Sequence, residues 1–213
     1  MQRSGTPATG PVRTPALAED DGGDGGDGAR ALSALRAWAL TQGRAELADA
    51  CERMHAASPV TDWRTLPGPT GEANLYAVRP RDHVLCLAGT GAAGDADRLT
   101  QLAAVLAVGA QAMWPADALA LAGRLPPDVR ARITLTQDWT RPDVPLDAVL
   151  HHGDAAQRLA LAAALAERPG AIVGLVALEP GDADVPLERL VVERSLSINT
   201  AAAGGNASLM TID

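Results

Sequence analysis

Two uninterrupted apolar runs stand out along the chain, at residues 83–88 and 171–178. Runs of this length and composition are typical of strands that are buried on both faces of a parallel sheet. Residues 74–79 alternate between apolar and polar positions, which predicts an edge strand that ends at Pro80. Three shorter apolar stretches indicate further strands, at residues 110–114, 133–135 and 146–151.

Apolar residues at helical spacing predict helices between these strands. One set follows the i, i+3, i+4, i+7 pattern of a single helix face: Leu99, Leu102, Ala103 and Leu106. Gly109 is expected to cap that helix at its carboxyl end. Further helices are predicted at residues 29–57 (with a break or kink at Gly43), 117–125 and 155–167. The alternation of strands and helices implies an α/β layer fold with a mainly parallel sheet.

The two ends of the chain depart from this pattern. Residues 1–28 are rich in Gly and Asp and nearly free of large apolar groups, which predicts a disordered linker. Residues 187–198 predict a long strand or a pair of strands. The tail that follows is small and uncharged until its last residue, Asp213, and it carries apolar groups near its end. Such a tail is expected to dock into a groove on another folded body.

Composition narrows the classes of function. Of the 213 residues, 47% are hydrophobic, and 18 basic residues (all of them Arg) face 26 acidic ones, giving a net charge of −8. An acidic chain without a basic stripe argues against nucleic-acid binding. No apolar run reaches the length of a membrane span, and the first residues do not resemble a secretory signal. Two cysteines exclude a disulfide framework and a four-thiolate zinc site, and they suit a cytoplasmic protein.

A glycine motif follows the first apolar run. Gly89, Gly91 and Gly94 match the G-x-G-x-x-G pattern between a strand and a helix, which is where a dinucleotide pyrophosphate binds. However, Asp95 and Asp97 place carboxylates at the start of that helix, where they would repel a pyrophosphate. The second strand also ends without an acidic residue to bind a ribose. An NAD site here is therefore an alternative to a simple glycine-rich turn.

The remaining candidate residues favour structural roles. His151 and His152 are adjacent on a strand, so their side chains point to opposite faces and cannot easily share a metal ion. Asp154 is expected to cap the next helix. Cys51 and Cys86 lie among apolar residues, where a thiolate is disfavoured. No nucleophile elbow, phosphate-binding loop or zinc-protease motif occurs in the sequence.

Several stretches resemble the PutA family of bifunctional proline dehydrogenases and L-glutamate-γ-semialdehyde dehydrogenases. The resemblance covers roughly residues 60–213 and is carried by residues 66–72, 101–109, 152–154 and, above all, 193–212. The final Asp213 departs from the Gly expected there. The Gly89 motif is not expected of the family.

The resemblance implies a Rossmann-like, three-layer domain from the carboxyl end of that enzyme. The longer enzyme uses FAD to oxidise proline and NAD to oxidise the semialdehyde, and it is expected to be a homo-oligomer. This piece is implied to lack catalytic residues, metal and cofactor. It is implied to pack on the aldehyde dehydrogenase domain of the same or a companion chain, to imitate a dimer contact and to seal the channelling cavity. The dehydrogenase's Cys and Glu contexts are absent here.

The chain is accordingly divided into four expected parts. Residues 1–28 form the linker, residues 29–65 a helical segment, residues 66–186 the Rossmann-like domain, and residues 187–213 a strand and docking tail. The residues expected to carry docking are Glu193, Arg194, Ser195, Asn199, Thr200, Gly204, Gly205, Asn206, Ser208, Leu209 and Met210.

Overall fold

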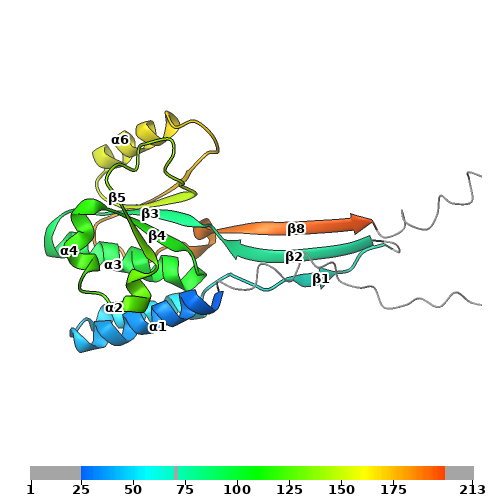
Figure 1. The fold of residues 1–213 in the computed structure, drawn as a ribbon, viewed down its shortest axis with the longest axis horizontal. Coiled ribbons are helices and arrows are strands. Elements are labelled where there is room, and N and C mark those ends of the chain that lie inside the picture. Colours follow the sequence, from blue (N-terminus) through cyan, green and yellow to red (C-terminus); the bar gives the residue numbers. More distant parts are fainter. Residues whose placement is uncertain (1–24, 70–71, 200–213) are drawn as a thin grey trace, which may run out of the picture.

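A computed structural model, which describes residues 25–69 and 72–199, is built on a five-stranded parallel sheet (Figure 1). The strand order is β5-β4-β3-β6-β7. The strands are β3 (His83–Leu87), β4 (Gln111–Pro115), β5 (Ile133–Thr136), β6 (Ala148–His152) and β7 (Gly174–Leu178). The predicted α/β fold with a mainly parallel sheet is confirmed.

β3 lies in the middle of this sheet because it is apolar on both faces. Val84 and Cys86 point into the larger hydrophobic core on one side, whereas Leu85 points into a smaller core on the other side. All three side chains are fully buried. The continuous apolar run at residues 83–88 therefore has the structure that its pattern predicts.

The helices α1 (Gly25–Thr41), α2 (Ala45–Ala56) and α3 (Gly91–Val108) cover the side of the larger core (Figure 1). The predicted break at Gly43 separates α1 from α2, and Gly43 has a φ of 67°. Gly109 caps α3 in the left-handed conformation, as its position predicts.

The first helix begins at Gly25, four residues before the predicted start. Its path over the carboxyl end of α3 depends on Gly28, where a Cβ would stand 2.6 Å from the Cα of Gly109. Two glycines thus allow a close approach of two backbones, a tertiary effect that local composition does not reveal. The rest of the predicted linker, residues 1–24, lies outside the described residues.

The predicted helix over residues 117–125 is shorter and divided. It consists of a 3₁₀ turn, η2 (Ala116–Ala118), followed by α4 (Leu119–Ala122). A separate one-turn helix, α5 (Pro127–Arg130), begins after Pro126. The two adjacent prolines end one helix and allow the next to start.

A single helix, α6 (Ala155–Ala166), packs on the other face of the sheet (Figure 1). Asp154 caps it in the predicted way: its carboxylate accepts a hydrogen bond from the Gln157 backbone N–H at 2.8 Å, and the Gln157 side chain accepts one from the Asp154 N–H at 3.0 Å. This reciprocal pair is a capping box.

The second apolar run differs from its prediction as a fully buried strand. β7 begins only at Gly174, it is one of the two edge strands of the sheet, and Ala177 is exposed. Ile172 lies before the strand and is 98% exposed. The prediction was wrong because apolar composition does not tell whether a neighbouring element covers the strand.

The remaining strands form a second sheet that extends away from the domain body as an arm (Figure 1). It consists of β1 (Arg64–Leu66), β2 (Glu72–Pro80) and β8 (Val191–Asn199), antiparallel and in that order. β2 is the central strand, so its prediction as an edge strand was wrong: β1 and β8 both pair with it. The predicted strand at residues 187–198 comprises a 3₁₀ turn, η3 (Leu187–Leu190), and β8.

Candidate functional site

The glycine motif lies at the topological switch point of the parallel sheet. From β3 the chain proceeds to β4 on one side, whereas β6 leads to β7 on the other side. Open α/β sheets bind ligands in the crevice outside the carboxyl ends of two such strands. Gly91 has a φ of 78°, and a Cβ at Gly94 would overlap the carbonyl group of Gly89. The structure therefore brings the three predicted glycines together in one tight turn, and geometry requires two of them to be Gly.

The prediction that Asp95 and Asp97 lie at the start of the helix was wrong: α3 begins at Gly91, so both carboxylates lie in its second turn, where they have structural partners. Asp95 forms an ion pair of 2.8 Å with Arg124. Asp97, which is buried, accepts a hydrogen bond of 2.9 Å from the Gly181 backbone N–H. These contacts hold α3 to the loops around it. They explain the carboxylates without any ligand at the helix end.

A cavity of about 370 Å³ adjoins the same turn on the α6 side of the sheet. Its lining is mostly apolar and comes from β3, β6, α6 and Trp139, with His151, His152 and Gln157 as polar members. His151 is buried, its Nδ1 has no hydrogen-bond partner, and desolvation by burial is the main cause that lowers its pKa. The imidazole is therefore held toward its neutral form.

The adjacent histidines serve opposite faces of β6, as the sequence predicts. Both side chains border the cavity beside α6, but His152 is also hydrogen-bonded to Gln101 of α3, on the other side of the sheet. Within residues 25–69 and 72–199, no group of three or more His, Cys, Asp or Glu side chains could hold a metal ion. The Gln101 partner, 51 positions away in sequence, has no signal in the local pattern.

Neither cysteine has the surroundings of a nucleophile. Cys51 on α2 and Cys86 on β3 are both buried free thiols. Burial is the main cause that raises the pKa of each to about 12. A thiol with such a pKa contains almost no thiolate at neutral pH, so neither side chain is suited to attack an aldehyde.

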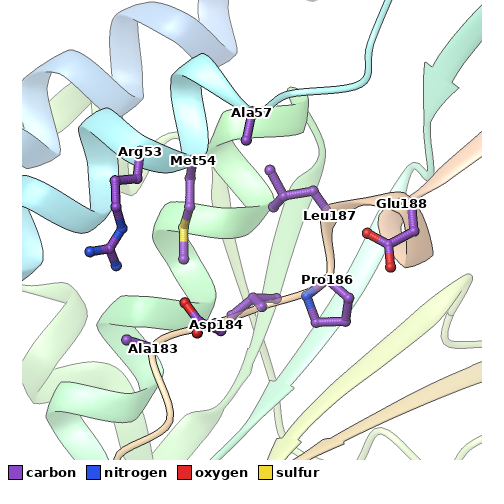
Figure 2. A pocket seen from close by; sticks show the side chains of 9 residues that line it. Arg53, Met54, Ala57, Ala183, Asp184, Pro186, Leu187 and Glu188 are labelled. Carbon is purple, nitrogen blue, oxygen red and sulfur yellow. The ribbon is translucent and has the colours of Figure 1, made fainter.

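A second, open pocket of about 410 Å³ lies between α2 and the segment that precedes η3 (Figure 2). Met54, Ala57 and Leu187 give it an apolar wall, and Arg53 and Asp184 carry charges at its margin (Figure 2). Its composition does not define a reaction. One wall of this pocket is formed by the segment at residues 183–188.

β8 forms one of the two outer edges of the arm, and β1 forms the other. β8 pairs with β2 from Val191 to Asn199, and within the described residues no strand pairs with its other edge. Three predicted docking residues, Glu193, Arg194 and Ser195, lie exposed on this strand. Asn199 is its last residue. The other predicted docking residues lie outside the described part of the chain: Thr200, Gly204, Gly205, Asn206, Ser208, Leu209 and Met210.

The outer surface of α6 is apolar and uncovered. Its only polar residues are Gln157 and Arg158, yet Leu161 is its only buried side chain. Leu159 is 73% exposed. A helix with so few polar residues is typically buried, so its exposure makes it a candidate contact surface. This surface was not among the sequence predictions, although the uncharged run from Leu159 to Ala166 was its signal.

No helix in the described part of the chain is long and apolar enough to cross a membrane.

The fold defines an α/β domain of the Rossmann-like kind found in aldehyde dehydrogenases. It is similar to proline utilization A (PutA) from Bdellovibrio bacteriovorus, with a TM-score of 0.57 and 10% identity over 75% of this chain and 20% of that one. It is also similar to lactaldehyde dehydrogenase from Escherichia coli, with a TM-score of 0.54 and 13% identity over 73% of this chain and 40% of that one. At these identities the likeness concerns the fold alone. No family model matches the sequence.

The sequence relationship is more specific: the chain is homologous to the bifunctional PutA proteins. It is 49% identical to PutA of Escherichia coli K12 over 183 residues, which are 85% of this chain and 13% of that protein. It is 42% identical to PutA of Rhizobium meliloti over 154 residues, which are 69% of this chain and 12% of that protein. The resemblance to the PutA family is thus confirmed, and the chain spans about an eighth of the length of these relatives.

Proposed function

We propose that the chain is the non-catalytic, C-terminal lid and interaction domain of a cytoplasmic, homo-oligomeric enzyme that converts proline to glutamate. In this proposal it packs on the L-glutamate-γ-semialdehyde dehydrogenase domain and seals the cavity through which the intermediate passes. The chemistry, with its FAD and NAD, belongs to other parts of the enzyme. This domain excludes water and retains a reactive intermediate.

The exposed apolar surface of α6 carries the proposal. Burying a leucine or isoleucine side chain contributes about 1.5–3 kcal/mol, so leaving Leu159 and Ile172 in water forgoes a substantial stabilisation. In the described part of the chain, the small hydrophobic core beneath the helix has four buried residues: Leu85, Met113, Val149 and Leu161. A partner domain over α6 would complete this thin layer. The homology to much longer proteins makes such a partner a natural expectation.

The arm supports the same proposal independently. The free edge of β8 presents backbone N–H and C=O groups that can pair with a strand of another domain. The predicted docking tail continues directly from this strand. If the β8 edge and the tail both bind the dehydrogenase domain, they would fix the position of this domain over the channelling cavity.

The experiment that tests the proposal uses a full-length homologue from which the residues aligned with 193–213 are removed. With proline as substrate, the time lag before NADH forms reports how well the intermediate is retained. We expect the deletion to lengthen the lag, while the dehydrogenase still oxidises added semialdehyde. An unchanged lag would contradict the proposal that the tail helps to seal the cavity. Aldehyde oxidation by the isolated 213-residue chain would contradict its non-catalytic role.

A second candidate function, NAD binding, is favoured by the position of the Gly89 turn at the switch point. If it holds, millimolar NAD should raise the melting temperature of the isolated chain through ligand linkage. The Gly89→Ala variant is a suitable comparison, because a Cβ there meets no atom within 4 Å and the fold should persist. An absence of any shift would reject this function.

A further inference from the structure

The cavity beside the glycine turn has the position and size of a binding site for a small molecule. It measures about 370 Å³ and lies at the carboxyl ends of β3 and β6, the neighbouring strands from which the sheet winds in opposite directions. Open α/β sheets bind ligands in this crevice, in pockets of about 300–1,000 Å³. A cavity of about 150 Å³ already accommodates benzene, so this one has room for two fused rings.

Small residues on α6 create this space. Four of the lining residues lie on one face of the helix, at spacings of three and four positions: Gln157, Ala160, Leu161 and Ala164. Two of the four are alanines, whose side chains end at Cβ. The volume between the helix and the sheet is therefore left open on this side.

Trp139 supplies an aromatic wall whose backbone is held by the end of α6. The guanidinium of Arg168, just after the helix, donates hydrogen bonds to three carbonyl oxygens of the Trp139 loop: Trp139 at 2.8 Å, Arg141 at 2.9 Å and Val144 at 2.7 Å. Moving the loop away from α6 would break these bonds. The cavity is thus pre-formed, as is usual for small-molecule sites.

Most polar groups of the lining are already used by the fold. The two ring nitrogens of His152 are in hydrogen bonds, with Gln101 at 2.8 Å and with the carbonyl oxygen of Asp182 at 2.9 Å. The side-chain oxygen of Gln157 accepts from the Asp154 backbone N–H. Within the described part of the chain, no Asp, Glu or Arg lines the cavity. The lining therefore offers no counter-charge to a phosphate or carboxylate, and it favours a neutral ligand.

His151 retains an unused hydrogen-bonding group. Its side chain lines the cavity, it is 7% exposed, and its Nδ1 has no hydrogen-bond partner. A Cβ at Gly153 would stand 2.4 Å from the imidazole Cε1, so the ring lies directly over the Gly153 backbone. Buried polar groups in proteins are nearly always paired, and a missing partner points to a ligand.

We propose that this cavity binds a neutral aromatic molecule of one or two rings, which carries a hydroxyl group that forms a hydrogen bond with His151. A hydroxyl can donate or accept, so it suits either tautomer of the neutral imidazole. The rings lie against Trp139 and the alanines of α6, where aromatic contact adds to the gain from burying apolar surface.

This site differs from the NAD site considered for the Gly89 turn, because a dinucleotide carries a charged pyrophosphate that the lining does not neutralise. It is also independent of the packing of the domain on a dehydrogenase.

Titration of the intact 213-residue chain with 2-naphthol tests the proposal. A matched probe, 2-methylnaphthalene, has nearly the same shape but forms no hydrogen bond. ¹H–¹⁵N NMR spectra should show that both probes shift the amide signals of cavity residues such as Gly89 and Ala164. In His151→Ala, the affinity for 2-naphthol should fall about three- to tenfold, the value of one hydrogen bond, whereas that for 2-methylnaphthalene should not fall.

A second pair of variants locates the site without altering His151. Ala160→Trp places a large side chain in the cavity wall and should abolish the binding of both probes. Ala163→Trp, the matched control, changes an exposed alanine of α6 that does not line the cavity, and it should bind both probes as the unaltered chain does.

Three results would overturn the proposal. One is the absence of binding by either probe up to its limit of solubility. Another is binding that Ala160→Trp leaves unchanged, which would place the probes on the exposed surface of α6 instead. The third is an equal loss of affinity for the two probes in His151→Ala, which would contradict the hydrogen bond to the imidazole.

Discussion

Gly94 lies so close to the carbonyl group of Gly89 that no side chain fits between them. The contact seats the first turn of α3 against the end of β3, the central strand. The glycine motif therefore has a structural explanation that applies whether or not a nucleotide binds.

This contact predicts a difference between two alanine substitutions. Gly94→Ala should destabilise the chain by about 1–3 kcal/mol, because the new methyl group must displace backbone atoms. Gly89→Ala should change the free energy of unfolding by less than about 0.5 kcal/mol, the range of exposed sites. Urea denaturation measures both. Equal effects of the two substitutions would contradict the packing role of Gly94.

The capping box of α6 gives a second prediction. Asp154→Ala should cost about 1 kcal/mol of stability, because the Gln157 N–H loses its acceptor. Hydrogen exchange should locate the loss in the first turn of α6. Asp49→Ala, at an exposed position inside α2, is the matched control and should have little effect.

The thiols should be unreactive in the folded chain. With the pKa of Cys51 and Cys86 raised to about 12, almost no thiolate exists at pH 8. Alkylation by iodoacetamide should therefore proceed only through unfolding, and should accelerate in denaturant. Because the folded-state pKa lies above the unfolded value, stability should decline as the pH rises past the ordinary thiol range, near 9. Rapid alkylation in native buffer would contradict the burial of these groups.

The α6 surface should tolerate charge in the isolated chain. Leu159→Glu should change the free energy of unfolding by less than about 0.5 kcal/mol, because the side chain is mostly in solvent. Leu161→Ala, on the buried side of the same helix, should cost about 2–5 kcal/mol. Thermal or urea unfolding separates the two. A large destabilisation by Leu159→Glu would show that the chain covers this surface itself.

Local sequence patterns were sufficient to predict those elements whose structure is determined by a few neighbouring residues. The apolar run of β3, the spacing along α3, Gly109 and Asp154 each specify a structure within a few positions. Burial by distant segments was harder to predict. β2 became central because β8 returns to it from more than 100 positions away.

The candidate sites follow the same division. The glycine turn and the opposed histidines could be predicted from strand geometry. The network of Gln101, His152 and Asp182 joins three elements that no local pattern connects. The outer face of α6 is exposed because no described segment packs on it, and local sequence patterns do not show which segments pack on a helix.

The most direct test of the central claim, that this domain packs on a dehydrogenase, is complementation in trans. Escherichia coli PutA without the segment that matches this chain is mixed with the 213-residue chain, and the lag before NADH forms from proline is measured. We predict that the unaltered chain binds and shortens the lag, whereas Leu159→Glu, equally well folded, does so at least tenfold less effectively. A lag that does not change with added chain, or that the variant shortens equally, would contradict the account.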